Sequence, residues 1–70
     1  MNKKLVISAR RENGQAVFFR GYFDKRDMTE FLDLAADFSS YPRKVALDKI
    51  EFLKPWYAGL SDWRIEKVIK

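Results

Sequence analysis

Two short runs of alternating apolar residues meet at Asn13-Gly14, and this arrangement constrains the fold more than any other feature of the chain. In residues 5–10, Leu5, Ile7 and Ala9 point to one side and their neighbours to the other, as in a β-strand. Asparagine and glycine suit the two positive-φ positions of a type I′ turn, and residues 16–23 then return as a second β-rich run. We therefore expect a β-hairpin.

A helix is expected directly after the hairpin, over residues 24–38. Asp24 or Asp27 can cap its first turn, and Glu30 follows Asp27 by three residues, as in a capping box. Pro42 ends the helix, because proline disfavours helical geometry in the residue before it. At about 100° per residue, two groups of side chains separate onto opposite sides. The apolar group is Met28, Phe31, Leu32, Leu34, Ala35 and Phe38, and the acidic group is Glu30, Asp33 and Asp37.

The second half of the chain allows two interpretations. Residues 45–53 form either a strand with Ala46, Ile50 and Phe52 on one face, or a helix that starts near Pro42 and aligns Ala46, Ile50 and Leu53. Residues 62–69 alternate as a strand, although residues 61–62 would also cap a helix. We favour two strands, because one hairpin with one helix makes a poor core. The expected fold class is α+β: a small antiparallel sheet in ββαββ order with one amphipathic helix packed on one face, with ββαα as the alternative.

Composition limits the possible functions. The chain has 70 residues, so we expect a single domain over residues 1–70 with a marginal core. Cysteine and histidine are both missing, which removes disulfides, thiolate metal sites and imidazole catalysis. We expect no catalytic residues, no metal and no cofactor, since a chain this small rarely encloses a pocket that shifts a carboxylate pKa. No apolar run approaches the roughly 18 residues of a membrane helix, so a cytoplasmic protein without a membrane partner is expected.

Charge and aromatic residues indicate a binding surface. Residues 24–38 hold five carboxylates against two basic side chains, a net charge of −3 within a chain of +4, which leaves +7 for the remainder. In the second run of the hairpin, Val17, Phe19 and Phe23 share one face, while Phe18, Arg20 and Tyr22 share the other. If the first set is inside, the second is exposed beside Arg10. The carboxy-terminal segment with Trp56, Tyr57 or Trp63, a second copy of the chain, or a partner would then cover it.

The leading hypothesis is a non-catalytic protein-binding module, because interfaces favour aromatic residues and arginine as anchors. The candidate partner-binding residues are Arg10, Phe18, Arg20, Tyr22, Trp56, Tyr57 and Trp63. The order hairpin, helix, strand in a small cysteine-free chain resembles, in layout only, bacteriophage proteins that inhibit host enzymes, such as inhibitors of bacterial RNA polymerase and several anti-CRISPR proteins. That resemblance implies occlusion of a surface on a larger protein. A homodimer is a further possibility.

The alternative hypothesis is a nucleic-acid-binding domain that uses the same aromatic and arginine sheet face. Rings flanked by arginine on an open sheet stack bases and neutralise phosphates. The four residues 20–23, Arg-Gly-Tyr-Phe, resemble the start of the RNP1 motif of RNA-recognition domains. The residues that follow depart from that motif.

Overall fold

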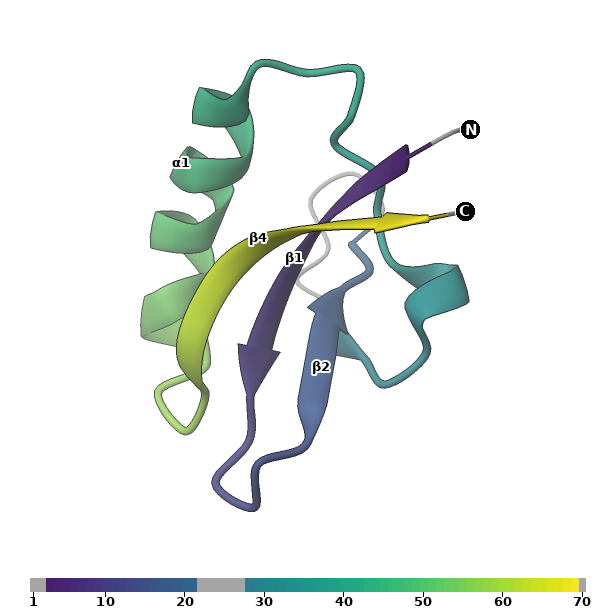
Figure 1. The fold of residues 1–70 in the computed structure, drawn as a ribbon. Helices are drawn as coiled ribbons and strands as arrows, with labels where there is room; N and C mark the ends of the chain where they lie inside the picture. Colours follow the sequence, from purple (N-terminus) through teal and green to yellow (C-terminus); the bar gives the residue numbers. More distant parts are fainter. Residues whose placement is uncertain (1–2, 22–27, 70) are drawn as a thin grey trace.

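A computed structural model describes residues 3–21 and 28–69 of the chain. It is an α+β fold in which a four-stranded antiparallel sheet carries one α-helix (Figure 1). The strands lie in the order β3-β2-β1-β4. Their bounds are β1 Lys3–Arg10, β2 Ala16–Phe19, β3 Met28–Thr29 and β4 Ser61–Ile69; the helix α1 is Arg43–Leu53, and short 3-10 turns η1 and η2 are Leu32–Leu34 and Lys54–Trp56.

The expected hairpin is present, with Ala9 paired to Val17, but its turn differs from the prediction. Gly14 has a φ of 88°, whereas Asn13 is not among the residues with positive φ, so the turn is not type I′. The Gly14 N–H donates to the Arg11 carbonyl at 2.8 Å, and the Arg11 N–H donates to the Gln15 carbonyl at 2.9 Å. These bonds close a three-residue loop in which glycine takes the left-handed position.

β4 is the long partner of β1, and the predicted strand over residues 62–69 is confirmed. Pairing runs from Lys3 opposite Ile69 to Ser8 opposite Arg64, so the described ends of the two strands lie side by side (Figure 1). Between Arg64 and Ser61 the strand gains one residue over β1, and Asp62 adopts a φ of 58° there. This is a β-bulge, which bends a strand and increases its twist, and β4 curves strongly in Figure 1.

The predicted helix over residues 24–38 is wrong in its described part, residues 28–38; residues 24–27 lie outside the described residues. Met28–Thr29 pairs with β2 instead, and only Leu32–Leu34 turns as a 3-10 helix. The cause is tertiary: the Ala36 N–H donates to the Phe19 carbonyl at 2.9 Å, and the Phe38 N–H donates to the Leu5 carbonyl at 2.8 Å. Phe31 and Leu34, expected in the core, are consequently exposed.

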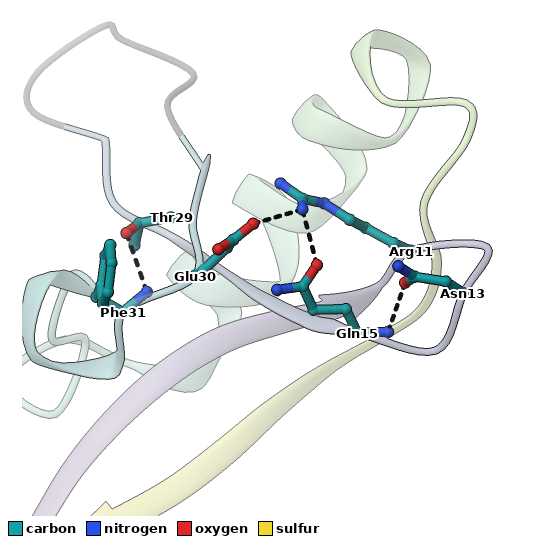
Figure 2. A network of polar contacts seen from close by, with 6 residues as sticks. All are labelled: Arg11, Asn13, Gln15, Thr29, Glu30 and Phe31. Carbon is teal, nitrogen blue, oxygen red and sulfur yellow. Dashed lines mark hydrogen bonds and ion pairs between the residues drawn. The ribbon is translucent and has the colours of Figure 1, made fainter.

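Side chains tie the start of this segment to the hairpin loop (Figure 2). Arg11 pairs with the Glu30 carboxylate and also donates to the Gln15 amide oxygen at 2.8 Å. The Thr29 hydroxyl accepts the Phe31 N–H at 3.1 Å, which turns the chain away from β3. The acidic residues therefore do not form the predicted acidic helix face, and Glu30 faces the hairpin instead.

The only α-helix in the described residues is α1, where we favoured a strand. It buries Ala46, Ile50 and Leu53, the set expected for the helical alternative, while Phe52 is exposed. Helix-forming residues such as leucine, lysine and glutamate dominate the segment, which favours a helix where both periodicities fit. The core between α1 and the sheet contains Ile7, Phe19, Phe38, Ala46, Ile50 and Leu53.

Candidate functional site

The sheet face away from α1, where we expected exposed aromatic residues, is largely covered. Val17 and Phe19 are buried on the opposite side, as the hairpin pattern required, but Phe18 is only half-exposed. Its neighbours on the covered face include Val6, with none of its surface exposed, and buried Ser8 and Thr29. The 3-10 turn η1 lies on this side (Figure 1), and Lys4 Nζ donates to the Leu32 carbonyl at 3.2 Å. In the part of the chain that the structure describes, this face is therefore not an open stacking surface.

Of the arginines expected on that face, Arg20 is exposed and Arg10 is half-buried. The Arg10 guanidinium donates to the Gly14 carbonyl at 3.3 Å, so it braces its own hairpin loop. Tyr22 and Phe23 lie outside the described residues.

The three carboxy-terminal aromatic candidates separate into two groups. Tyr57 and Trp63 pack against the core on the α1 side of the sheet. They do not fold across the Phe18 face, so that explanation for the aromatic surplus is wrong for this pair. Trp56 differs, because it is 60% exposed.

Trp56 belongs to an apolar surface that the sequence analysis missed. Val45, Lys49 and Phe52 lie within an arc of about 60° on one flank of α1, and Trp56 continues their line into η2. Val45 is 38% exposed and Phe52 45%. Tyr41, 55% exposed, extends the line at the amino-terminal end of the helix. We call these five residues the α1 stripe: Tyr41, Val45, Lys49, Phe52 and Trp56.

Lys49 places one positive charge in the middle of the α1 stripe. Its Nζ lies 5.2 Å from the ring centre of Phe52 and 5.7 Å from that of the buried Phe19, within cation–π distance of both rings. Within the described part of the chain, Lys49 forms no ion pair with a carboxylate. The charge is thus held by aromatic faces and is available to an anionic group from outside.

A hollow of about 240 Å³ opens beside the amino-terminal half of the α1 stripe. Phe38 forms part of its wall and contacts Tyr41, with ring centres 6.2 Å apart. This volume lies below the roughly 300–1,000 Å³ of small-molecule pockets, so it suits a single inserted side chain better than a substrate. The lining residues are Phe19, Gly21, Ala36, Asp37, Phe38, Tyr41, Val45 and Lys49.

Two exposed carboxylates, on α1 and β4, pair with neighbouring cations. Glu51 pairs with Lys54 at 3.0 Å, and Asp62 pairs with Arg64 at 2.7 Å, in both cases at the surface. The hydrogen bond that Arg64 donates to the Asp62 carboxylate, and then the negative charge of that carboxylate, raise the pKa of the Arg64 guanidinium above its ordinary value. Across residues 3–21 and 28–69, no group of three or more acidic side chains is placed to hold a metal ion.

A wider depression lies between the hairpin loop and the loop before β4. It is shallow, and its rim joins Arg11 and Glu12 to Trp56 and Leu60. Trp56 therefore borders both this depression and the α1 stripe. Among the described residues, no helix is long and apolar enough to cross a membrane.

The signal for the α1 stripe is present in the sequence but depends on choosing the helix. Val45, Phe52 and Trp56 are separated by seven and four residues, which aligns them on a helix and scatters them on a strand. Because we favoured a strand over residues 45–53, the spacing did not indicate a common surface.

Comparison of the chain with protein-family models, with curated proteins and with solved structures finds no match. Inference about function therefore depends on the surface itself.

Proposed function

We propose that this protein is a non-catalytic protein-binding module that recognises its partner through the α1 stripe. The observation that carries the proposal is the exposure of Tyr41, Phe52 and Trp56 along one flank of α1. Burying a large apolar side chain stabilises a protein by about 1.5–3 kcal/mol. Three exposed aromatic rings along one flank of a small domain therefore indicate an interaction surface. Aromatic residues around a pocket are typical anchors of protein interfaces.

The chemistry of the α1 stripe describes the partner. The hollow beside Tyr41 and Val45 accepts one apolar or aromatic side chain, and Lys49 favours a carboxylate next to it. Arg43 and Lys44 add positive charge at the amino-terminal end of α1, where the helix dipole is also positive. The partner surface is accordingly apolar with acidic residues around it.

The mode of action that follows is occlusion. The elements run in the order β1, β2, β3, α1, β4, so the layout is only loosely that of the expected hairpin, helix and strands. The hollow of about 240 Å³ beside the α1 stripe suits one inserted side chain, so we infer that the domain occupies a functional surface of a larger protein, as the layout resemblance to phage inhibitors implies. Nucleic acid is the alternative ligand. We favour it less than a protein partner, because the sheet face proposed to stack bases is buried at Val6, Ser8 and Thr29.

Affinity capture with matched variants tests this function. Tagged wild-type protein is incubated with bacterial lysate, with and without nuclease, beside Tyr41→Ala, Trp56→Ala and Lys49→Glu. Phe31→Ala is the control, since Phe31 is 66% exposed but lies outside the α1 stripe. Circular dichroism and thermal unfolding establish that every variant is folded.

We expect one protein to be recovered in the presence of nuclease, to be lost with the three variants in the α1 stripe and to be retained by Phe31→Ala. A partner recovered equally by all variants contradicts the α1 stripe as the binding surface. Recovery that depends on intact nucleic acid, with affinity that falls steeply with salt, supports the alternative function instead.

A further inference from the structure

The outer edge of β4 is a second interaction surface, independent of the α1 stripe. β4 ends the sheet order and pairs with β1 along one edge, and no other described strand pairs with its second edge. It spans nine residues, Ser61–Ile69. A long unpaired edge presents N–H and C=O groups that template pairing with another strand.

The contacts of Leu5 show which groups of β4 point outward. The Leu5 N–H donates to Asp37 Oδ1 at 3.2 Å, and its carbonyl accepts the Phe38 N–H at 2.8 Å, so both groups point away from β4. Backbone direction alternates along a strand, so Lys4 and Val6 point toward β4. Their partners Val68 and Glu66 point back toward β1, which leaves Ile65 and Lys67 with outward N–H and C=O groups.

We propose that β4 pairs antiparallel with β4 of a second copy of this chain, with Ile65 opposite Ile65 at the two-fold axis. This register sets the outward groups of Ile65 against each other and those of Lys67 against Trp63 of the second copy. It also places Arg64 opposite Glu66 of the second copy, and symmetry repeats that pair on the other side of the axis. Both side chains belong to the regular part of β4, beyond the bulge at Asp62.

Charge selects this register over its neighbours. A shift by one residue sets outward groups against inward ones, so only registers that differ by two are compatible with the ladder. A centre at Arg64 puts arginine directly opposite arginine, and a centre at Glu66 puts glutamate opposite glutamate. Like charges in direct opposition destabilise a strand pair, whereas the centre at Ile65 gives two attractive pairs.

The Arg64 side chain is available for this contact. Its bond to Asp62 is at the surface, with 49% of the arginine side chain exposed, and exposed ion pairs contribute little. Arg64 can therefore leave Asp62, or bind it together with Glu66 of the second copy, at a small cost in free energy. The resulting dimer is isologous and has one continuous eight-stranded sheet, in which the free edge of each β4 pairs with the free edge of the other.

Charge exchange between two variants tests the proposal. Sedimentation equilibrium at low salt measures dimerisation of the wild type up to millimolar concentration. Arg64→Glu and Glu66→Arg each replace two attractions by two repulsions, so each is expected to weaken homodimerisation about tenfold or more. An equimolar mixture of the two variants restores complementary pairs and is expected to form a heterodimer. The double variant R64E/E66R is expected to recover the homodimer.

A backbone variant tests the ladder separately from the charges. Lys67→Pro removes one outward N–H, which β1 does not use, and proline is tolerated at such edge positions. We expect it to remain folded and to lose dimerisation. Tyr41→Ala and Trp56→Ala lie on the α1 stripe and are expected to dimerise as the wild type does, which separates this proposal from the proposed function.

A wild type that stays monomeric at millimolar concentration overturns the proposal. A dimer that survives Arg64→Glu, Glu66→Arg and Lys67→Pro unchanged also overturns it, because such a dimer uses another surface. A mixture of the two charge variants that stays monomeric contradicts the register.

Discussion

The Asp37 carboxylate accepts a hydrogen bond from the Leu5 backbone N–H at 3.2 Å, across 32 residues of sequence. The same oxygen accepts the Ser39 N–H at 2.9 Å, and the next residue, Phe38, donates its N–H to the Leu5 carbonyl. One acidic side chain thus fastens the segment after η1 to the first strand. This contact helps to position Phe38 in the core and Tyr41 in the α1 stripe.

Asp37→Ala is expected to destabilise the fold by about 1–2 kcal/mol, because it leaves a part-buried N–H without its charged acceptor. Asp37→Asn keeps an acceptor oxygen and should lose less. Urea unfolding measures both, with exposed Asp33→Ala as the control, for which a change within about 0.5 kcal/mol is expected. Equal midpoints for Asp37→Ala and Asp33→Ala would show that the contact contributes nothing.

Leu53→Ala tests which face of residues 45–53 packs into the core. Leu53 is fully buried between α1 and the sheet, so its truncation is expected to cost about 2–5 kcal/mol, a large share of the stability of a small domain. Leu47 and Phe52 are exposed, and alanine at either position should cost much less. Thermal unfolding compares the three variants. A strand over this segment would reverse the order of Leu53 and Phe52.

Gly14→Ala is expected to destabilise the hairpin by about 1–2 kcal/mol, because alanine resists the φ of 88° at this position. Space is not the cause, since nothing lies within 4 Å of a Cβ added there. Gly59 offers the matched control: a Cβ there also meets nothing within 4 Å, and its φ is not positive. Gly59→Ala should therefore be neutral in chemical denaturation, and equal losses at both positions would contradict the backbone argument.

Local alternation of apolar and polar residues predicted the two long strands and the hairpin loop. The alternation in residues 5–10 and 62–69 survives as β1 and β4, and Gly14 marks the hairpin loop. The coarse class, an antiparallel sheet with one helix, follows from these strands. For residues 45–53 the sequence fitted both helix and strand periodicity. Only the burial of Leu53 instead of Phe52 distinguishes the helix from the strand.

The segment over residues 28–38 could not be predicted from its own letters. Its helical periodicity is real, yet the N–H groups of Ala36 and Phe38 bond to Phe19 and Leu5, which no local pattern encodes. The candidate site inherited both errors. Trp56 was among the candidate partner-binding residues and is exposed, whereas Tyr41, Val45 and Phe52 join it only once the helix is placed at Arg43–Leu53.

The amino-terminal end of α1 leaves room for stabilisation. Pro42 at the N-cap position makes no side-chain hydrogen bond, and the first turn holds no acidic residue. Arg43 instead places a positive charge at the positive end of the helix dipole. Arg43→Glu is expected to stabilise the protein by about 0.3–1 kcal/mol, with Arg43→Gln giving a smaller gain because it only removes the unfavourable charge.

Salt dependence separates this effect from a change in helix propensity. Charge–dipole interactions at an exposed helix end are screened by ions, whereas propensity is not. The gain of Arg43→Glu should therefore be largest in low salt and shrink in molar salt, as measured by urea unfolding at both concentrations. A gain that is independent of salt would assign the effect to propensity. If the partner is acidic, as proposed, the same variant binds it more weakly, so stability and recognition make opposite demands on this helix end.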